Sequence, residues 1–159
     1  GGPDAPGNLL RRVDVTGPRT LTVEGPDAHG RKLFIGIPYE SSYTFSTFAI
    51  REGDSKGNAV TTGRLQLRRL TLNCSNTGFL HMHVTPKFRP TSTYTFTGRE
   101  LGHGTNIIGA IPLYTGTINF PILSLNTQVE VKVGSDSFLP FALVNASWEG
   151  FYNTRNARV

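Results

Sequence analysis

The amino-acid sequence predicts an all-β fold, an antiparallel sandwich or barrel-like domain with many short strands and loops rich in glycine and proline. Short segments with alternating apolar and polar residues recur at close spacing, and turn residues separate them. No segment has an apolar stripe of period 3.6 over the length of a helix. The pattern indicates roughly nine to eleven strands without an internal repeat.

The composition fits one such domain. The chain has 159 residues, including 18 glycines and 10 prolines, and only 17 % are charged, against about 25 % in ordinary soluble domains. The net charge of +5 is compatible with nucleic acid, an anionic membrane surface or an acidic protein, but the basic residues form no stripe interleaved with aromatics. The single cysteine excludes an internal disulfide, and no apolar run reaches the ~18 residues needed to span a membrane.

The strongest strand pattern is Thr61–Asn73, which we predict to be a core strand. Its apolar positions alternate until Arg68–Arg69, where the phase slips by one residue. A β-bulge at Arg68–Arg69 would absorb the slip; the alternative is a second half that is buried on both faces. In either case arginines project from the first half, and four leucines are predicted to face the core: Leu65, Leu67, Leu70 and Leu72.

Before this strand, we predict a turn-rich start at residues 1–8, two strands that form a hairpin or lie as neighbours, a short apolar strand and an aromatic strand. Their ranges are Leu10–Val15, Arg19–Glu24, Lys32–Ile37 and Tyr39–Ile50. A charged loop follows at residues 51–58. Pro38 marks a possible boundary, with residues 1–36 as an N-terminal linker and strands and residues 37–159 as the C-terminal β-sandwich domain.

After this strand, we predict a turn at Cys74–Gly78 that makes a hairpin with Phe79–Val84. A long loop covers Gly98–Gly109, and a turn at Thr115–Gly116 separates two short strands. The other predicted strands are Thr93–Thr97, Thr127–Val133 and Ala142–Trp148.

Candidate chemical sites are few. His81 and His83 would lie on one face of a strand and could bind a metal with His103 or Cys74 as a third ligand, but a His-x-His pair is more often an ordinary strand feature. Cys74 lacks a recognisable nucleophile motif, the carboxylates are isolated, and the glycine-rich loop at residues 102–105 matches no phosphate-binding motif. We therefore predict no catalytic residue, no metal and no cofactor. The aromatic cluster at residues 148–152 could close the core or form an interface.

A series of short motifs resembles a known family. In order they are Ile37-Pro-Tyr-Glu, Tyr43-Thr-Phe-Ser, Thr62-Gly-Arg-Leu-Gln-Leu-Arg-Arg, Thr77-Gly-Phe, Val84-Thr-Pro, Thr97-Gly-Arg, Phe120-Pro-Ile and Trp148-Glu-Gly-Phe-Tyr. Together they resemble the C-terminal part of the tail tubular B, or tail nozzle, proteins of short-tailed bacteriophages, over roughly residues 33 to 159. The family's proteins are far longer than this chain.

The resemblance implies a structural protein of the virion tail without enzymatic activity. It implies a homohexameric ring that extends the tail tube, contacts a tail adaptor protein and tail fibres, and lets DNA pass during ejection. We expect the interface to include Arg64, Arg68, Arg69, Trp148, Phe151 and Tyr152, with the arginines forming ion pairs between subunits or with fibres.

Two other classes remain open from the sequence. One is a non-catalytic carbohydrate-binding sandwich that uses Trp148, Phe151 and Tyr152. The other is a metal-dependent enzyme at His81 and His83. The structural subunit is the favoured interpretation, the binding module the second and the enzyme the third.

Overall fold

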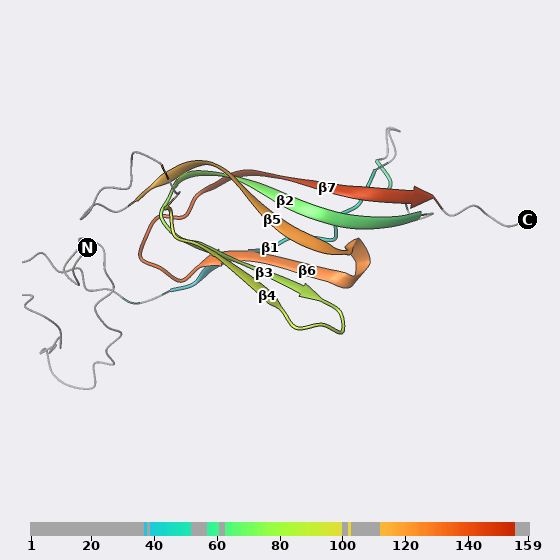
Figure 1. The fold of residues 1–159 in the computed structure, drawn as a ribbon, viewed down its shortest axis with the longest axis horizontal. Coiled ribbons are helices and arrows are strands. Elements are labelled where there is room, and N and C mark those ends of the chain that lie inside the picture. Colours follow the sequence, from blue (N-terminus) through green and yellow to red (C-terminus); the bar gives the residue numbers. More distant parts are fainter. Residues whose placement is uncertain are drawn as a thin grey trace, which may run out of the picture.

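Two antiparallel sheets packed face to face form the fold (Figure 1). The structure is a computed structural model that describes residues 37, 39–51, 57–60, 63–99, 102 and 112–154. The four-stranded sheet has the order β1 (Ser41–Thr44), β6 (Val129–Ser135), β3 (Leu80–Pro86) and β4 (Ser92–Phe96). The three-stranded sheet has the order β5 (Tyr114–Leu125), β2 (Gly63–Thr77) and β7 (Leu143–Thr154). The predicted all-β sandwich is confirmed.

The core lies between the two sheets and is aliphatic. Strand β2 contributes the largest share, because its four predicted core leucines are all buried. The facing sheet contributes Leu80, Met82, Val84, Val131 and Val133, and β5 adds Phe120 and Ile122. Each fully buried side chain of this kind stabilises the fold by roughly 1.5–3 kcal/mol.

The predicted β-bulge in β2 is confirmed. Leu67 and Arg69 pair with residues of both neighbouring strands, whereas Arg68 between them pairs with neither. The extra residue lets Leu67 and Leu70 both face the core, although they are three positions apart. The alternative of a second half buried on both faces is wrong, because Thr71 and Asn73 are only half-buried and bond side chains of neighbouring strands on the outer face.

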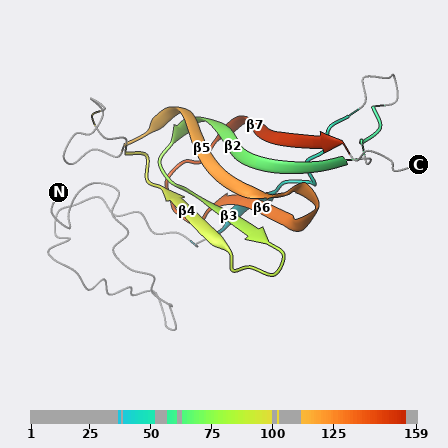
Figure 2. The same cartoon turned by 45° about the vertical axis from the view of Figure 1, so that its right-hand side comes forward.

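Strand β5 has a second irregularity in its pairing, beside the bulge of β2. Two β5 residues, Ile122 and Leu123, lie between the β5 residues that pair with Arg69 and Leu67. At the same place β2 has one unpaired residue and β7 has none. Leu123 takes a left-handed conformation with φ 51°. Extra residues on successive strands increase twist, and β5 curves over towards β6 in Figure 2. The short 3₁₀ helix η1 (Asn126–Gln128) then connects β5 to β6 in the opposite sheet.

Two predicted turns are wrong. Strands β2 and β3 do not form a hairpin, because β2 continues to Thr77 and β3 belongs to the other sheet. The chain crosses between sheets at Gly78, where a Cβ would lie 2.9 Å from the Cβ of Leu139. Thr115–Gly116 lies inside the continuous strand β5, and the Thr115 hydroxyl accepts a hydrogen bond from the Asn76 amide across the ladder.

The other strand predictions are largely confirmed, with changed lengths. In β4, Tyr94 and Phe96 pack towards the core and the threonines face outward. In β6, Val131 and Val133 are buried, but the strand begins at Val129 because the preceding residues form η1. Strand β1 is shorter than predicted, and β7 is longer. The strands predicted within residues 1–36, the tip of the loop at residues 52–56 and most of Gly98–Gly109 lie outside the described residues, and the domain boundary at Pro38 stays a prediction.

Candidate assembly surface

The three predicted interface arginines all project from the outer face of β2. Alternation places Arg64, Gln66 and Arg68 on the outer face, and the bulge then turns Arg69 to the same side. On β7, Asn153 lies opposite Arg64, Phe151 lies opposite Gln66 and Glu149 lies opposite Arg69. We call Arg64, Arg68, Arg69, Glu149 and Phe151 the arginine–phenylalanine surface.

Two of the arginines in this surface make side-chain contacts with residues of β7. The Arg68 guanidinium lies 5.1 Å from the centre of the Phe151 ring, and the Phe151 residue stays 56 % exposed. An Arg69 nitrogen lies 3.0 Å from a carboxylate oxygen of Glu149, the residue directly opposite on β7. Such an exposed pair contributes at most about 1 kcal/mol to stability, so its main effect is to fix the orientation of both charges.

The aromatic cluster of the sequence is divided between two faces of β7. Trp148 and Tyr152 face the other sheet and pack against the core, with Trp148 in edge contact with Phe48 at 6.1 Å between ring centres. Phe151 faces outward. A Cβ on Gly63 would lie 2.5 Å from the Tyr152 ring, and the buried Tyr152 hydroxyl has no hydrogen-bond partner among the residues that the structure describes. Of the three predicted aromatic interface residues, only Phe151 lies on the outer face beside the arginines.

Beyond Arg69, β2 presents polar, uncharged side chains on this outer face, a feature absent from the sequence-based predictions. Thr71 donates to the Asn119 side chain at 2.7 Å. Asn73 donates to Asn145 at 2.6 Å and accepts from Thr117 at 2.6 Å, so that one row crosses all three strands. The repeated pattern of asparagine and threonine at alternate positions in β2 and β5 could have indicated it.

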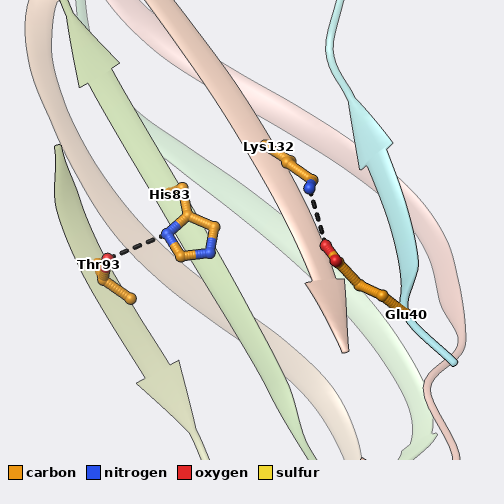
Figure 3. Close-up of polar contacts among 4 residues, drawn as sticks. All are labelled: Glu40, His83, Thr93 and Lys132. Atoms are coloured by element: carbon orange, nitrogen blue, oxygen red, sulfur yellow. Dashed lines mark hydrogen bonds and ion pairs between the residues drawn. The ribbon is translucent and has the colours of Figure 1, made fainter. Parts of the chain in front are cut away.

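The predicted histidine pair alternates with buried residues in β3 and lies on the outer face of the four-stranded sheet. Figure 3 shows His83 of this pair with Thr93, Lys132 and Glu40. The rings of His81 and His83 are 4.8 Å apart, and His83 Nδ1 lies 3.0 Å from the Thr93 hydroxyl. Lys132 lies opposite His83 in the ladder and donates to Glu40 at 2.8 Å. A lysine ammonium beside two imidazoles disfavours a bound cation, and the described part of the chain has no group of three metal-ligating side chains.

Burial and the positive charge of Lys132 shift the pKa values of side chains in this cluster. Partial burial lowers the pKa of His81, and the neighbouring His83 lowers it further. The hydrogen bond and positive charge of Lys132 lower the pKa of Glu40. Cys74 is buried on the inner face of β2, where burial raises the pKa of its thiol, so the thiol stays protonated and is a poor nucleophile.

The fold is a β-sandwich whose outer faces carry charged and polar side chains. Among the described residues there is no helix long and apolar enough to cross a membrane. A family model described as the bacteriophage nozzle protein matches residues 4–159, and the chain belongs to this family. The resemblance drawn from the sequence motifs is thereby confirmed, and the chain is a component of the virion tail.

A curated relative agrees with this assignment. The chain is 33 % identical over 132 residues to the tail tubular protein gp12 of Escherichia phage T7. The alignment covers 82 % of this chain and 16 % of the phage T7 protein, so the chain spans only a small part of the length of this relative.

Proposed function

We propose that the chain is a structural subunit of a bacteriophage tail nozzle that assembles with copies of itself into a ring. In this proposal the ring contacts the tail adaptor and tail fibre proteins and lets phage DNA pass during ejection. The observation that carries the proposal is the arginine–phenylalanine surface, which combines exposed arginines with a half-exposed aromatic ring on the outer face of the sheet. Arginine and aromatic residues are enriched in protein interfaces, where the fully buried ones contribute most of the binding energy.

The geometry refines which contacts the arginines make. Arg69 already pairs with Glu149 of the same chain, so it would bring a fixed ion pair, with little net charge, to a neighbouring subunit. Arg68 lies over Phe151, and a neighbour that covers both would desolvate the cation and the ring together. We therefore expect carboxylates of the adjacent subunit or fibre to approach Arg64 and Arg68 rather than Arg69.

We also propose that this part of the protein is not an enzyme. The protonated Cys74 thiol and the lysine beside the histidine pair support this. Glu40 and Glu149 are engaged in ion pairs within the described part of the chain, which further argues against a catalytic carboxylate pair at either residue.

Sedimentation velocity of the purified chain over a wide concentration range tests the proposal. We expect a discrete oligomer for the unchanged chain and a shift towards monomer when both Arg64→Glu and Arg68→Glu are introduced. Arg99→Glu, an exposed change away from this surface, is the matched control. Circular dichroism should be the same for all three proteins. An unchanged oligomer in the double variant would remove the arginine–phenylalanine surface from the interface.

The carbohydrate-binding alternative gains no support from the geometry. A sugar-binding platform needs aromatic rings side by side on an exposed face, whereas Trp148 and Tyr152 pack inward and Phe151 faces outward. Tryptophan fluorescence should therefore not change when host polysaccharide is added.

A further inference from the structure

The tip of the β3–β4 hairpin presents one fully exposed aromatic ring. Phe88 is 98 % exposed, the highest exposure of any large apolar residue in the described part of the chain. Lys87 and Arg89 flank it, and both are exposed. Figure 1 shows this hairpin extending at the edge of the sandwich, at the same end as η1.

Several contacts hold the tip in one shape. The Arg89 amide donates to the Pro86 carbonyl at 3.4 Å, which closes a four-residue turn, and the Lys87 amide donates to the Gln128 carbonyl at 2.8 Å. The hydroxyls of Thr85 and Thr91 are 2.9 Å apart across the neck of the hairpin. Prolines precede and follow the tip and restrict the backbone further.

Phe88 is unfavourable in this position for two reasons. Its φ is 65°, the left-handed conformation that the third residue of a type II turn requires and that glycine or asparagine adopts most easily. Its ring also gains nothing from burial within the chain. Backbone strain at a non-glycine residue supports a hypothesis of function, and Phe88 combines this strain with an almost fully exposed ring between two cations.

We propose that Phe88 inserts into an apolar pocket with a carboxylate-lined rim on a neighbouring protein of the tail, other than a second copy of this chain. Lys87 and Arg89 would pair with the rim, and the fixed turn would reduce the entropy cost of docking. This inference rests on the proposed place of the chain in an assembled tail.

The charge and the shape of the tip favour an acidic pocket on another protein over a second copy of this chain and over a lipid surface. The chain carries 16 lysines and arginines against 11 aspartates and glutamates, so an acidic partner protein complements the cationic tip better than a second copy does. A lipid surface needs no fixed side-chain direction, and a single aromatic ring gives it little area to bind. A shaped, acidic pocket uses both the rigid turn and the two cations.

Site-specific photo-crosslinking in assembled tails tests the inference. A benzophenone-bearing phenylalanine is placed at position 88, and a matched control places it at Thr95, an exposed residue of the same hairpin. We expect a crosslink from position 88 to a peptide of another tail protein that contains Asp or Glu among apolar residues, and none from position 95. A crosslink to lipid or to another copy, or no crosslink in tails that contain the protein, would overturn it. Absence of the protein from the tails would overturn both this inference and the proposed function.

Two substitutions provide further tests of the proposed pocket. Phe88→Asn removes the ring but suits the left-handed backbone, so the Tm should not fall, while less of the neighbouring protein is retained on tails that are washed at high salt. Arg89→Glu in the benzophenone protein should reduce the yield of the crosslink about tenfold, because the rim carboxylates repel it. Unchanged retention and unchanged crosslinking in these variants would contradict the proposed pocket.

Discussion

The guanidinium of Arg68 lies 5.1 Å from the centre of the Phe151 ring, although Arg68 itself pairs with no residue in either ladder of β2. The bulge that keeps four leucines in the core is therefore also what gives the outer face two adjacent arginines. One local feature serves both the stability of the sandwich and the candidate interface.

Deleting Arg68 should be far more harmful than truncating it. Without the extra residue, every side chain on one side of the bulge would change faces, so that either the pair Leu65 and Leu67 or the pair Leu70 and Leu72 would face solvent. Arg68→Ala removes only the contact with Phe151, worth roughly 0.5–1 kcal/mol at an exposed site. Urea denaturation should show a loss of cooperative unfolding for the deletion and a small shift for Arg68→Ala. Similar midpoints for the two would show that the bulge does not set the register.

The ion pair between Arg69 and Glu149 should contribute little to stability. A double-mutant cycle with Arg69→Ala and Glu149→Ala should give a coupling energy of about 1 kcal/mol or less, because both side chains are half-exposed or more. The coupling should decrease further in 1 M salt. A salt-independent coupling above about 2 kcal/mol would mean that the pair is buried in the protein studied.

Stability should fall as the pH is lowered through the unfolded pKa of histidine, about 6.5. The folded state lowers the pKa of His81, so below this pH the unfolded state binds more protons than the folded state. The loss should begin near pH 7 and level off below the folded pKa. His81→Gln should flatten this part of the profile of unfolding free energy against pH, and an unchanged slope would rule out His81 as its source.

Two glycines with positive φ should respond differently to alanine. A Cβ on Gly98 would lie 2.5 Å from the Pro112 carbonyl oxygen, whereas no atom of the described residues lies within 4 Å of a Cβ on Gly102. Gly102→Ala should cost the left-handed strain, roughly 1–2 kcal/mol. Gly98→Ala adds a backbone clash and should lower Tm by several degrees more. Equal Tm values would mean that the loop around Gly98 can move apart freely.

Local patterns predicted the strands well because side-chain alternation is a local property. The phase slip at Arg68–Arg69 predicted the bulge, and the valines of β6 predicted its buried face. The predicted turns between strands were wrong where packing between residues distant in the sequence determines the path of the chain. Nothing near Gly78 in the sequence shows that Leu139 occupies the space beside it, and Thr115–Gly116 has turn-like residues inside a paired strand.

The candidate surface could be predicted only in part, because its arginines follow from local alternation whereas its aromatic residues depend on packing between the sheets. Its arginines follow from the pattern of β2, but the sequence alone treated the residues from Trp148 to Tyr152 as one cluster. Their division into Trp148 and Tyr152 inside and Phe151 outside depends on the face of β7 that packs against the other sheet. The exposed Phe88 depends on a backbone angle that sequence patterns do not give.

Electron cryo-microscopy of the intact tail would show whether the arginine–phenylalanine surface is an interface. We expect the outer face of β2 and β7 to be covered by a neighbouring subunit or tail protein, with Arg68 and Phe151 inside the contact. A carboxylate of the neighbour should lie within ion-pair distance of Arg64 or Arg68. A map in which this face is open to solvent in the assembled tail would show that it is not an interface.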